Sequence, residues 1–402
     1  MIGDSTKPGI AILTTYYRPV VGGVETAAES LATWLGAHGR VVHVLTTRTT
    51  RTAPGHERTG SVEVHRWPYL GRRRAWNKWL AVLPLAWAAW RLRHQVGLYF
   101  VVDFRATGLA ARLAGWLAGR PVIFQAETDG AFEVGALRRT VSRLPLVGRW
   151  LASVATWPIR RLYRGADLNI GISKTIVQEA VGAGWPADRV AYLPHPVDRT
   201  LFAPASRAER RALRQRLVLP LAAVLVVFVG RLSREKGIVD LAHAWRGLRV
   251  DGAHLVVVGP DMEGHPWNAG PEVRRLLANA PPATCVGGVS ASQVAEYLRA
   301  SDIVVLPSHF EAFGIAAAEG MSCGLPAVAT DVGGFRDYVR HGHNGLLVPP
   351  QNPEALRRAL SELIADENRR LAMGQAAHRD TAPFDRDVVF AQCEAWIDGL
   401  TQ

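Results

Sequence analysis

Residues Asp302–Val339 read DIVVLPSHFEAFGIAAAEGMSCGLPAVATDVGGFRDYV and contain the clearest structural pattern in the chain. The stretch opens with Asp302–Pro307, an apolar run rich in Ile and Val, which is typical of a buried strand. After a short loop, the composition predicts a helix from about Phe313 to Cys323, ended by a glycine and a proline. A second buried strand is predicted at Ala327–Thr330, so the stretch indicates a β–α–β unit.

Two carboxylates stand eight positions apart in this unit, Glu311 before the predicted helix and Glu319 inside it. At the rise of an α-helix they are separated by roughly 12 Å, which suits the two ends of an extended ligand rather than a shared proton. Between them, the backbone amides of Gly314 and Ile315 lie at the predicted helix N-terminus, where an anion is favoured. An ordinary β–α–β unit with two unrelated acids is the alternative interpretation.

A second motif, GRLSREKG at Gly230–Gly237, follows the predicted strand Ala222–Val229. Arg231 and Lys236 stand five positions apart in this glycine-bounded loop, so two cations are expected near one point. Such a pair can neutralise the charge that develops on a leaving diphosphate. A solvated basic loop is the alternative.

Together these motifs resemble those of the retaining GT-B glycosyltransferases of family four. The carboxylate pair is similar to the family's E-x7-E motif, and Pro-Ser, Glu-x-Phe-Gly, Gly-Leu-Pro and Gly-Gly-Phe-Arg-Asp agree in register. The loop at Gly230–Gly237 resembles Gly-Arg-Leu-x-x-x-Lys-Gly, and Gly22-Gly23-Val24-Glu25 resembles the Gly-Gly-x-Glu that follows the first strand in the family.

The resemblance implies a nucleoside-diphosphate sugar, UDP- or GDP-linked, as donor and transfer with retention of configuration. Glu311 would contact hydroxyls of the donor sugar, Glu319 would contact the ribose, and the helix end would face the diphosphate. The catalytic residues implied or considered are Arg231, Lys236, Glu311 and Glu127. The donor-binding residues are Gly22, Gly23, Gly230, Arg231, Lys236, Phe313, Gly314, Ile315 and Glu319.

The loop after the predicted strand Val122–Ala126 departs from the family, because many relatives have a His where this chain reads QAETDG. Glu127 or Asp129 could accept the acceptor hydroxyl's proton or bind sugar hydroxyls. Two acids that cap a turn are the alternative. The chain also has His195-Pro196 where family members usually carry Asn-Gly.

Strand–helix alternation in both halves predicts two doubly wound, Rossmann-like parallel-sheet domains of the α/β class, with a GT-B cleft between them. Three prolines within Pro194–Pro204 indicate an interdomain linker. We expect an acceptor-binding domain at residues 1–203 and a nucleotide-sugar-binding domain at 204–385. The resemblance implies that a final helix at 386–402 packs back on the first domain.

The composition limits the classes of protein that fit. A chain of 402 residues, 48% hydrophobic and 20% charged, has the composition of an ordinary globular protein with two domains. Its three cysteines lack metal-ligand spacing and indicate a reducing compartment, without disulfides or a zinc site. No convincing Asp-x-Asp site appears, so we expect no cofactor and no required metal. The N-terminus lacks an export signal, and the longest apolar runs are shorter than the roughly 20 residues that span a bilayer.

The basic excess lies in the N-terminal half. Residues 1–203 hold 26 Lys and Arg against 13 Asp and Glu, whereas residues 204–402 hold 21 against 22. No acid occurs from Val64 to Val102, or from Val134 to Ala166, and both regions carry Trp and Arg. This pattern is typical of contact with anionic lipid; ordinary domain helices with solvated arginines are the alternative.

We therefore expect a cytoplasmic enzyme, peripheral on the inner face of the membrane. Its acceptor would be a lipid-linked or membrane-associated glycan, used in cell-envelope or polysaccharide biosynthesis. The same chemistry on a soluble small molecule is the alternative. A non-catalytic protein that binds sugar or nucleic acid is the alternative of another class, but no nucleic-acid recognition motif is present, so nucleic acid is not expected as a partner.

Overall fold

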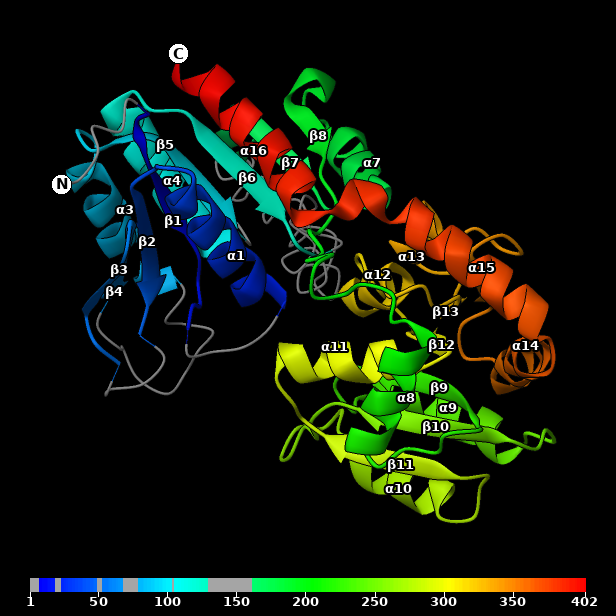
Figure 1. Ribbon diagram of the computed structural model, residues 1–402. Helices are drawn as coiled ribbons and strands as arrows, with labels where there is room; N and C mark the ends of the chain where they lie inside the picture. The colour runs from blue at the N-terminus through cyan, green and yellow to red at the C-terminus, as the bar shows by residue number, and fades with distance from the viewer. Residues whose placement is uncertain (1–6, 19–22, 49–52, 68–78, 103–104, 129–160) are drawn as a thin grey trace, which may run out of the picture. The chain divides into compact units, whose positions relative to one another are not determined.

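A computed structural model describes residues 7–18, 23–48, 53–67, 79–102, 105–128 and 161–402 (Figure 1). The chain divides into two compact units, unit 1 with Met1–His195 and Val389–Gln402, and unit 2 with Pro196–Val388. The boundary falls between His195 and Pro196, inside the proline-rich linker and earlier than the residue 204 that the sequence predicts. Gly22, Asp129 and most of the second acid-free region lie outside the described residues.

Unit 1 is built on an eight-stranded sheet of order β3-β4-β2-β1-β5-β6-β7-β8, in which only β3 runs antiparallel to its neighbour. The order reverses between β1 and β5, which is the switch point of a doubly wound fold. The elements of unit 1 are β1 (Gly9–Leu13), α1 (Gly23–Ala37), β2 (Val42–Thr47), β3 (His56–Thr59), β4 (Val62–Trp67), α3 (Val82–Arg91), β5 (Val96–Val102), α4 (Arg105–Ala118), β6 (Val122–Ala126), β7 (Leu168–Gly171), α7 (Lys174–Gly182), the 3-10 helix η1 (Ala187–Arg189), β8 (Val190–Tyr192) and, from Val389 onward, α16 (Arg386–Thr401).

Helices cover both faces of this sheet. Alpha-helices α1 and α16 pack over one face, where the rings of Trp34 and Phe390 lie 5.7 Å apart and both join the core with the strand residues. Helix α3 packs against α4 on the opposite face, where the Tyr99 hydroxyl of β5 donates to the carbonyl of Ala89 at 2.9 Å. The C-terminal helix, visible in red in Figure 1, is therefore part of the core of unit 1.

Unit 2 is built on a six-stranded, wholly parallel sheet of order β11-β10-β9-β12-β13-β14. Its strand order reverses between β9 and β12. The elements are α8 (Arg207–Arg216), β9 (Val224–Val229), η2 (Arg234–Lys236), α9 (Ile238–Arg246), β10 (Ala253–Val258), α10 (Gly270–Leu277), β11 (Ala283–Gly287), α11 (Ala291–Ala300), β12 (Ile303–Leu306), α12 (Ile315–Ser322), β13 (Ala327–Thr330), α13 (Phe335–Tyr338), β14 (Gly345–Val348), α14 (Pro353–Ala365), α15 (Glu367–Asp380) and η3 (Ala382–Phe384).

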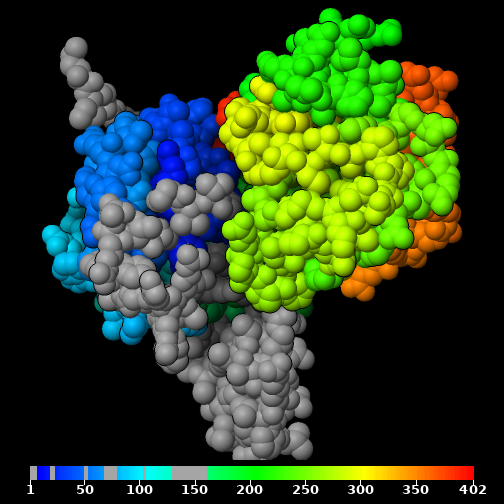
Figure 2. All heavy atoms as spheres, turned by 90° about the horizontal axis from the view of Figure 1, so that it is seen from below, coloured from blue at the N-terminus to red at the C-terminus, as the bar shows by residue number. Residues whose placement is uncertain are grey.

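The core of unit 2 lies mainly between its sheet and helices α9, α10 and α14. Trp245 of α9 is its largest fully buried side chain, and its indole N–H donates to the carbonyl of Pro281 at 3.0 Å. Helices α11 and α12 lie on the other face, because Gly320 packs directly on Val304 of β12. In the space-filling view of Figure 2, yellow residues of the α10–α11 region form part of the outer surface of this unit.

The predicted fold class is confirmed, and most predicted strands recur with ends shifted by one or two residues. Strand β3 was not predicted, because its four residues are all exposed and polar and carry no alternating pattern. Helix α12 begins at Ile315 rather than at Phe313. Gly314 adopts φ +88°, a left-handed conformation that ends any helix there, and a Cβ would lie 2.2 Å from the Phe335 ring.

A buried arginine attaches α16 to the rest of unit 1. The Arg40 side chain is fully buried and donates to Glu394 at 3.0 Å and to the carbonyl of Pro8 at 3.1 Å; it also pairs with Asp398. Although burial opposes it, hydrogen bonds from Lys7 and Arg40 hold the pKa of Glu394 below its ordinary value. The charge of Arg40 is thus compensated by two acids of the C-terminal helix.

We expect Arg40→Ala to lower the thermal unfolding midpoint strongly, because removing one member of a buried charge network costs about 3–5 kcal/mol. Arg358→Ala is the matched control, since Arg358 is exposed and only distantly paired with Glu354; it should change stability by less than about 0.5 kcal/mol. Circular dichroism melts of the three proteins provide the measurement. Equal midpoints for both variants would contradict the role given to Arg40.

Candidate active site

Two loops meet at the carboxyl edge of the sheet in unit 2, on either side of its switch point. The loop after β9 passes so close to the end of β12 that a Cβ on Gly237 would lie 1.8 Å from the carbonyl oxygen of Pro307. Gly237 also has φ +64°, and the amide of His309 donates to the carbonyl of Glu235 at 2.8 Å. In doubly wound sheets, ligands bind outside the carboxyl ends of strands at this kind of position.

An ion pair joins the two loops. The Nζ atom of Lys236 donates to Oε2 of Glu311 at 2.7 Å, and both side chains are largely buried. The hydroxyl of Ser308 donates to the same oxygen at 3.1 Å, and Thr330 at the end of β13 donates to the Ser308 carbonyl at 2.5 Å. The structure thus brings together two predicted catalytic residues that stand 75 positions apart, and adds Ser308 as a contact that the sequence motifs alone did not assign.

The second predicted cation is more accessible. Arg231 lies in the same loop, directly after Gly230, and its side chain is 55% exposed. It pairs with Glu235 at 3.1 Å, a contact between two exposed groups that contributes little to stability. The guanidinium of Arg231 can therefore exchange its ion pair with Glu235 for one with an anionic ligand.

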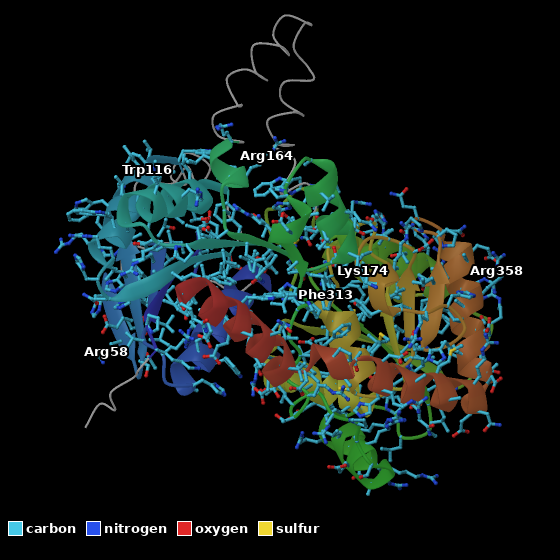
Figure 3. All side chains as sticks on the ribbon, turned by 90° about the horizontal axis from the view of Figure 1, so that it is seen from above. Arg58, Trp116, Arg164, Lys174, Phe313 and Arg358 are labelled. Atoms are coloured by element: carbon cyan, nitrogen blue, oxygen red, sulfur yellow. The ribbon has the colours of Figure 1, made fainter. Side chains whose placement is uncertain are left out.

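The start of α12 combines free amides with a rigid support. The first backbone amides of a helix have no intrahelical acceptor; in α12 these are the amides of Ile315 and Ala316, since Ala317 already donates to the Gly314 carbonyl at 2.9 Å. Just before them, Phe313 is buried and its ring lies 5.2 Å from Tyr338 and 5.5 Å from Phe384. The Tyr338 hydroxyl donates to the carbonyls of Phe313 and Gly314. The ring of Phe313, a predicted donor-binding residue that Figure 3 labels, thus anchors the loop from inside.

Glu319 differs from Glu311 in its electrostatics. Among the described residues, no hydrogen bond or ion pair reaches its carboxylate, although the side chain keeps partial contact with solvent. The apolar surroundings desolvate the group, and this burial raises its pKa to about 8. Below that pH the group is mainly a neutral carboxylic acid, and a buried acid without partners is a candidate for binding a ligand.

Unit 1 carries the remaining predicted side chain, and the structure gives it unexpected partners. Glu127, directly after β6, is buried; its Oε2 lies 2.7 Å from Nε2 of His195, and Gln125 donates to its Oε1 at 2.5 Å. Both oxygens are therefore engaged. His195 marks a departure from the family pattern in the sequence, but no spacing rule connects it with Glu127. Gly23 begins α1 and is exposed.

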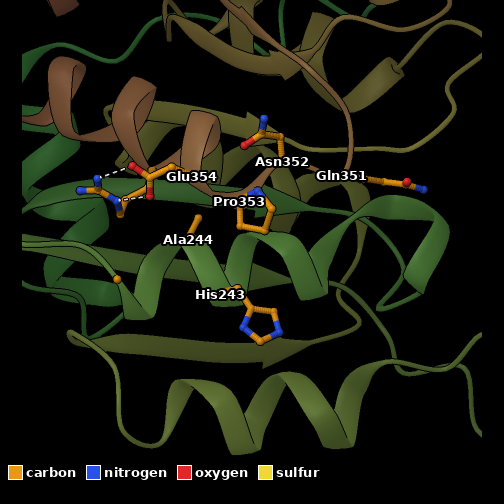
Figure 4. A pocket seen from close by; sticks show the side chains of 8 residues that line it. His243, Ala244, Gln351, Asn352, Pro353 and Glu354 are labelled. Atoms are coloured by element: carbon orange, nitrogen blue, oxygen red, sulfur yellow. Dashed lines mark hydrogen bonds and ion pairs between the residues drawn. The ribbon is translucent and has the colours of Figure 1, made fainter.

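A separate pocket of unit 2 contains none of the predicted residues. It has a volume of about 490 Å³ and lies between the end of α9 and the start of α14, lined by His243, Gln351, Asn352 and their neighbours. Figure 4 shows Glu354 turned toward Arg357, with which it forms two short hydrogen bonds. Because Glu354 and Arg357 neutralise each other, we find among the described lining residues no unpaired acid comparable to Glu319.

Two family models match the chain. The one described as "Glycosyl transferases group 1" matches residues 209–380, and the one described as "Glycosyl transferase 4-like domain" matches residues 22–196. The first covers the Arg231, Lys236, Glu311 and Glu319 region. The second covers most of the described sheet of unit 1.

Relatives in sequence carry the name D-inositol 3-phosphate glycosyltransferase. One from Xylanimonas cellulosilytica is 36% identical over 219 residues, covering 51% of this chain and 50% of that protein. One from Acidothermus cellulolyticus is 28% identical over 386 residues, covering 91% and 84%. The stronger alignments thus span about half the length of the curated relatives that they match.

Solved structures share the fold over almost the whole chain. Sucrose-phosphate synthase from Thermosynechococcus elongatus has a TM-score of 0.78 at 23% identity, covering 98% of this chain and 99% of that one. HepE of Anabaena, in complex with UDP-glucose, has a TM-score of 0.74 at 20% identity, covering 98% and 100%. At these identities the likeness establishes the two-sheet architecture.

The raised pKa of Glu319 predicts a particular dependence of stability on pH. In the unfolded chain this carboxyl ionises near 4.5, whereas in the folded chain it keeps its proton up to about 8. The folded state then binds the extra proton between these values, so stability falls as pH rises through this window. Glu319→Gln keeps the shape and removes the charge. We expect its unfolding midpoint to exceed that of the wild type increasingly from pH 5 to pH 8.

Thermal melts of both proteins at several pH values measure this difference. Glu367→Gln is the matched control, since the same substitution at an exposed position of unit 2 should leave the pH profile unchanged. Parallel profiles for wild type and Glu319→Gln would mean that Glu319 titrates like an ordinary surface acid.

Proposed function

Since the chain belongs to the group 1 glycosyltransferases, we propose that it transfers a sugar from a nucleoside-diphosphate donor to a small, soluble, phosphorylated acceptor. The observation that carries the donor half is the meeting of Lys236 and Glu311 at the switch point of unit 2. The acceptor half is supported by relatives named D-inositol 3-phosphate glycosyltransferase, one of which aligns with 91% of this chain. It also agrees with the basic excess of residues 1–203.

We propose that the diphosphate of the donor lies between the start of α12 and the loop of Arg231 and Lys236. Charge builds up on this leaving group as the glycosidic bond breaks, and preorganised cations stabilise it there. Lys236 is positioned for this by Glu311, while the exposed Arg231 exchanges Glu235 for phosphate. Glu319 would accept hydrogen bonds from the ribose hydroxyls, and retention of configuration follows from the family resemblance.

On unit 1, we propose that Glu127 acts through His195 instead of contacting the sugar directly. Both of its oxygens are engaged, one by His195 and one by Gln125, which leaves it poorly placed to take a proton from an acceptor hydroxyl. The carboxylate would fix the orientation of the imidazole, as paired acids do for functional histidines.

A membrane-associated acceptor is the second candidate, and one surface feature favours it. Six large apolar side chains, which we call the α3–α4 patch, are half or more exposed: Trp79, Leu80, Leu83, Trp87, Trp116 and Leu117. Trp116 lies on the outer surface of α4 in Figure 3. Arg91 stacks over Trp87 at 4.8 Å, so cations accompany the aromatic rings, as at anionic interfaces. The basic cluster at residues 72–78 lies outside the described residues.

The names of the relatives favour the soluble acceptor over the lipid-linked acceptor that the sequence placed first. Among the described residues, no helix has both the length and the apolar character needed to cross a bilayer. We propose a cytoplasmic location, with reversible contact between the α3–α4 patch and anionic lipid. The two candidates differ in where the acceptor is held, and an experiment separates them.

Replacing either cation should abolish most activity without unfolding the protein. We expect Arg231→Ala and Lys236→Ala each to lower turnover at least about a hundredfold, since one lost preorganised charge costs about 3 kcal/mol. Arg234→Ala is the matched control, because Arg234 belongs to the same loop but pairs with Glu272; it should retain turnover within a few-fold. Steady-state kinetics with the preferred donor provide the measurement. Near-normal turnover in both test variants would contradict the catalytic role proposed for Arg231 and Lys236.

Turnover should persist in excess chelator. If Arg231 and Lys236 neutralise the diphosphate, no divalent ion is needed at the leaving group. Initial rates measured with and without EDTA, immediately after its addition, should agree. Complete loss of activity that Mg²⁺ or Mn²⁺ restores would contradict this prediction.

The acceptor itself can be tested by supplying UDP- and GDP-sugars with either inositol phosphate or anionic vesicles that contain lipid-linked acceptors. We expect a glycosylated product with the soluble phosphate ester, and little with unphosphorylated inositol, because the basic half should recognise the phosphate. If product forms only on the vesicles, the membrane-associated acceptor becomes the better candidate.

Vesicle co-sedimentation then tests the α3–α4 patch independently of turnover. The variant Leu83→Ser/Trp116→Ser removes the two most exposed members of the patch, which are 73% and 75% exposed. It should bind anionic vesicles more weakly than the wild type, whereas Leu371→Ser on unit 2 should not differ. If the wild type ignores anionic vesicles at low salt, the patch has no role in lipid contact.

A further inference from the structure

Three side chains with metal-ligand atoms meet on the sheet of unit 1. His43 lies on β2, and Glu63 and His65 lie on β4. The parallel register places His43 beside Glu63, and the two-residue repeat of a strand puts His65 on the same face. Val44 and Val64 belong to the core on the other face, so the three side chains lie on the face that α3 covers.

The positions of these residues separate them from the candidate active site. His43 and Glu63 are each the second residue of their strand, so they lie near the amino ends of β2 and β4. The predicted donor and acceptor residues follow the carboxyl ends of strands instead. A role in sugar transfer does not account for this cluster.

The distances among the three ligand atoms fit one small ion. Nδ1 of His43 lies 3.3 Å from Nε2 of His65 and 3.5 Å from Oε2 of Glu63, and those last two atoms are 3.8 Å apart. A triangle with these sides has its centre about 2 Å from every corner, which is the usual length of a zinc–nitrogen or zinc–oxygen bond. Within the described part of the chain, this is the one group of three or more such residues whose ligand atoms converge.

The three ligands differ in their contact with solvent, since the side chain of His43 is 3% exposed, that of Glu63 21% and that of His65 30%. His43 is almost completely buried, and its Nε2 has no hydrogen-bond partner among the described residues. Arg58, labelled in Figure 3, forms an ion pair with Oε1 of Glu63 at 3.3 Å, which leaves Oε2 for the cluster.

We propose that His43, Glu63 and His65 form a binding site for a divalent transition-metal ion, with zinc as the best fit. The fourth position falls to water or to His56 of β3, whose Nε2 lies 3.8 Å from the same oxygen of Glu63. Two or three imidazoles with one carboxylate select zinc, cobalt or nickel over calcium and magnesium, which require oxygen ligands. The positive charge of Arg58 further disfavours an ion that binds by charge alone.

The ion would reinforce the edge of the sheet, where β3 has a single neighbouring strand. Strand β3 is a four-residue edge strand with every residue exposed, and it is held by its pairing with β4. A metal that bridges β2 and β4, with His56 as an optional ligand, would fasten this edge of the sheet. The expected effect is therefore on stability, and turnover at moderate temperature should not require the ion.

Metal binding by the 402-residue chain, purified without a histidine tag and stripped of metal, tests the proposal. Titration with Zn²⁺ by calorimetry should show one saturable site, and Co²⁺ should give the visible absorption bands of a tetrahedral complex. His65→Gln and Glu63→Gln, both at partly exposed positions, should each weaken Zn²⁺ binding at least about tenfold. His94→Gln, which changes an exposed histidine of the same unit outside the cluster, should bind like the wild type.

Stability supplies the second readout. Zn²⁺ should raise the unfolding midpoint of the wild type and of His94→Gln, and should leave Glu63→Gln unchanged, while Mg²⁺ and Ca²⁺ affect none of them. Absence of a saturable Zn²⁺ site and of cobalt bands in the wild type overturns the proposal, whether or not the variants fold. Equal Zn²⁺ affinity in His65→Gln and His94→Gln overturns it too. Neither result depends on the enzyme's donor or acceptor.

Discussion

The candidate active site depends on one steric constraint, the close passage of the β9 loop over the end of β12. Only glycine fits at Gly237, because any Cβ would meet the Pro307 carbonyl at 1.8 Å. This approach brings the backbone of Lys236 within reach of the loop that carries Glu311. The ion pair between them follows from the backbone contact, and the placement of Arg231 and of the start of α12 follows from the same two loops.

Within this frame the two acids of α12 and its preceding loop have opposite electrostatic states. Glu311 is charged and satisfied by Lys236 and Ser308, so it holds the cation in place. Glu319 has no such partner within the described part of the chain, and burial raises its pKa to about 8. A buried acidic group without a partner destabilises the fold, and such groups are expected where a ligand completes their hydrogen bonds. Glu311 positions Lys236, whereas Glu319 is the acid that we propose to bind the substrate.

The carboxyl and amino ends of the parallel strands carry different groups of proposed functional residues. The carboxyl ends carry the groups proposed for sugar transfer. The amino ends of β2 and β4 carry the His43–Glu63–His65 cluster, whose geometry suits zinc. The absence of cysteine pairs and Asp-x-Asp motifs from the sequence does not bear on ligands gathered from two strands.

The alternation of strands and helices, the two-sheet architecture and the two loops of unit 2 can be predicted from the sequence, because they depend on local patterns and on glycines within a few residues. Contacts between distant segments cannot: Lys236 with Glu311, Glu127 with His195, Arg40 with Glu394, and His43 with Glu63 all depend on the tertiary structure. The inward position of Phe313, and the lack of a partner for Glu319 among the described residues, depend on it as well. The physical reason is that strand order and register, which no local pattern encodes, set which side chains meet and how much water remains around them.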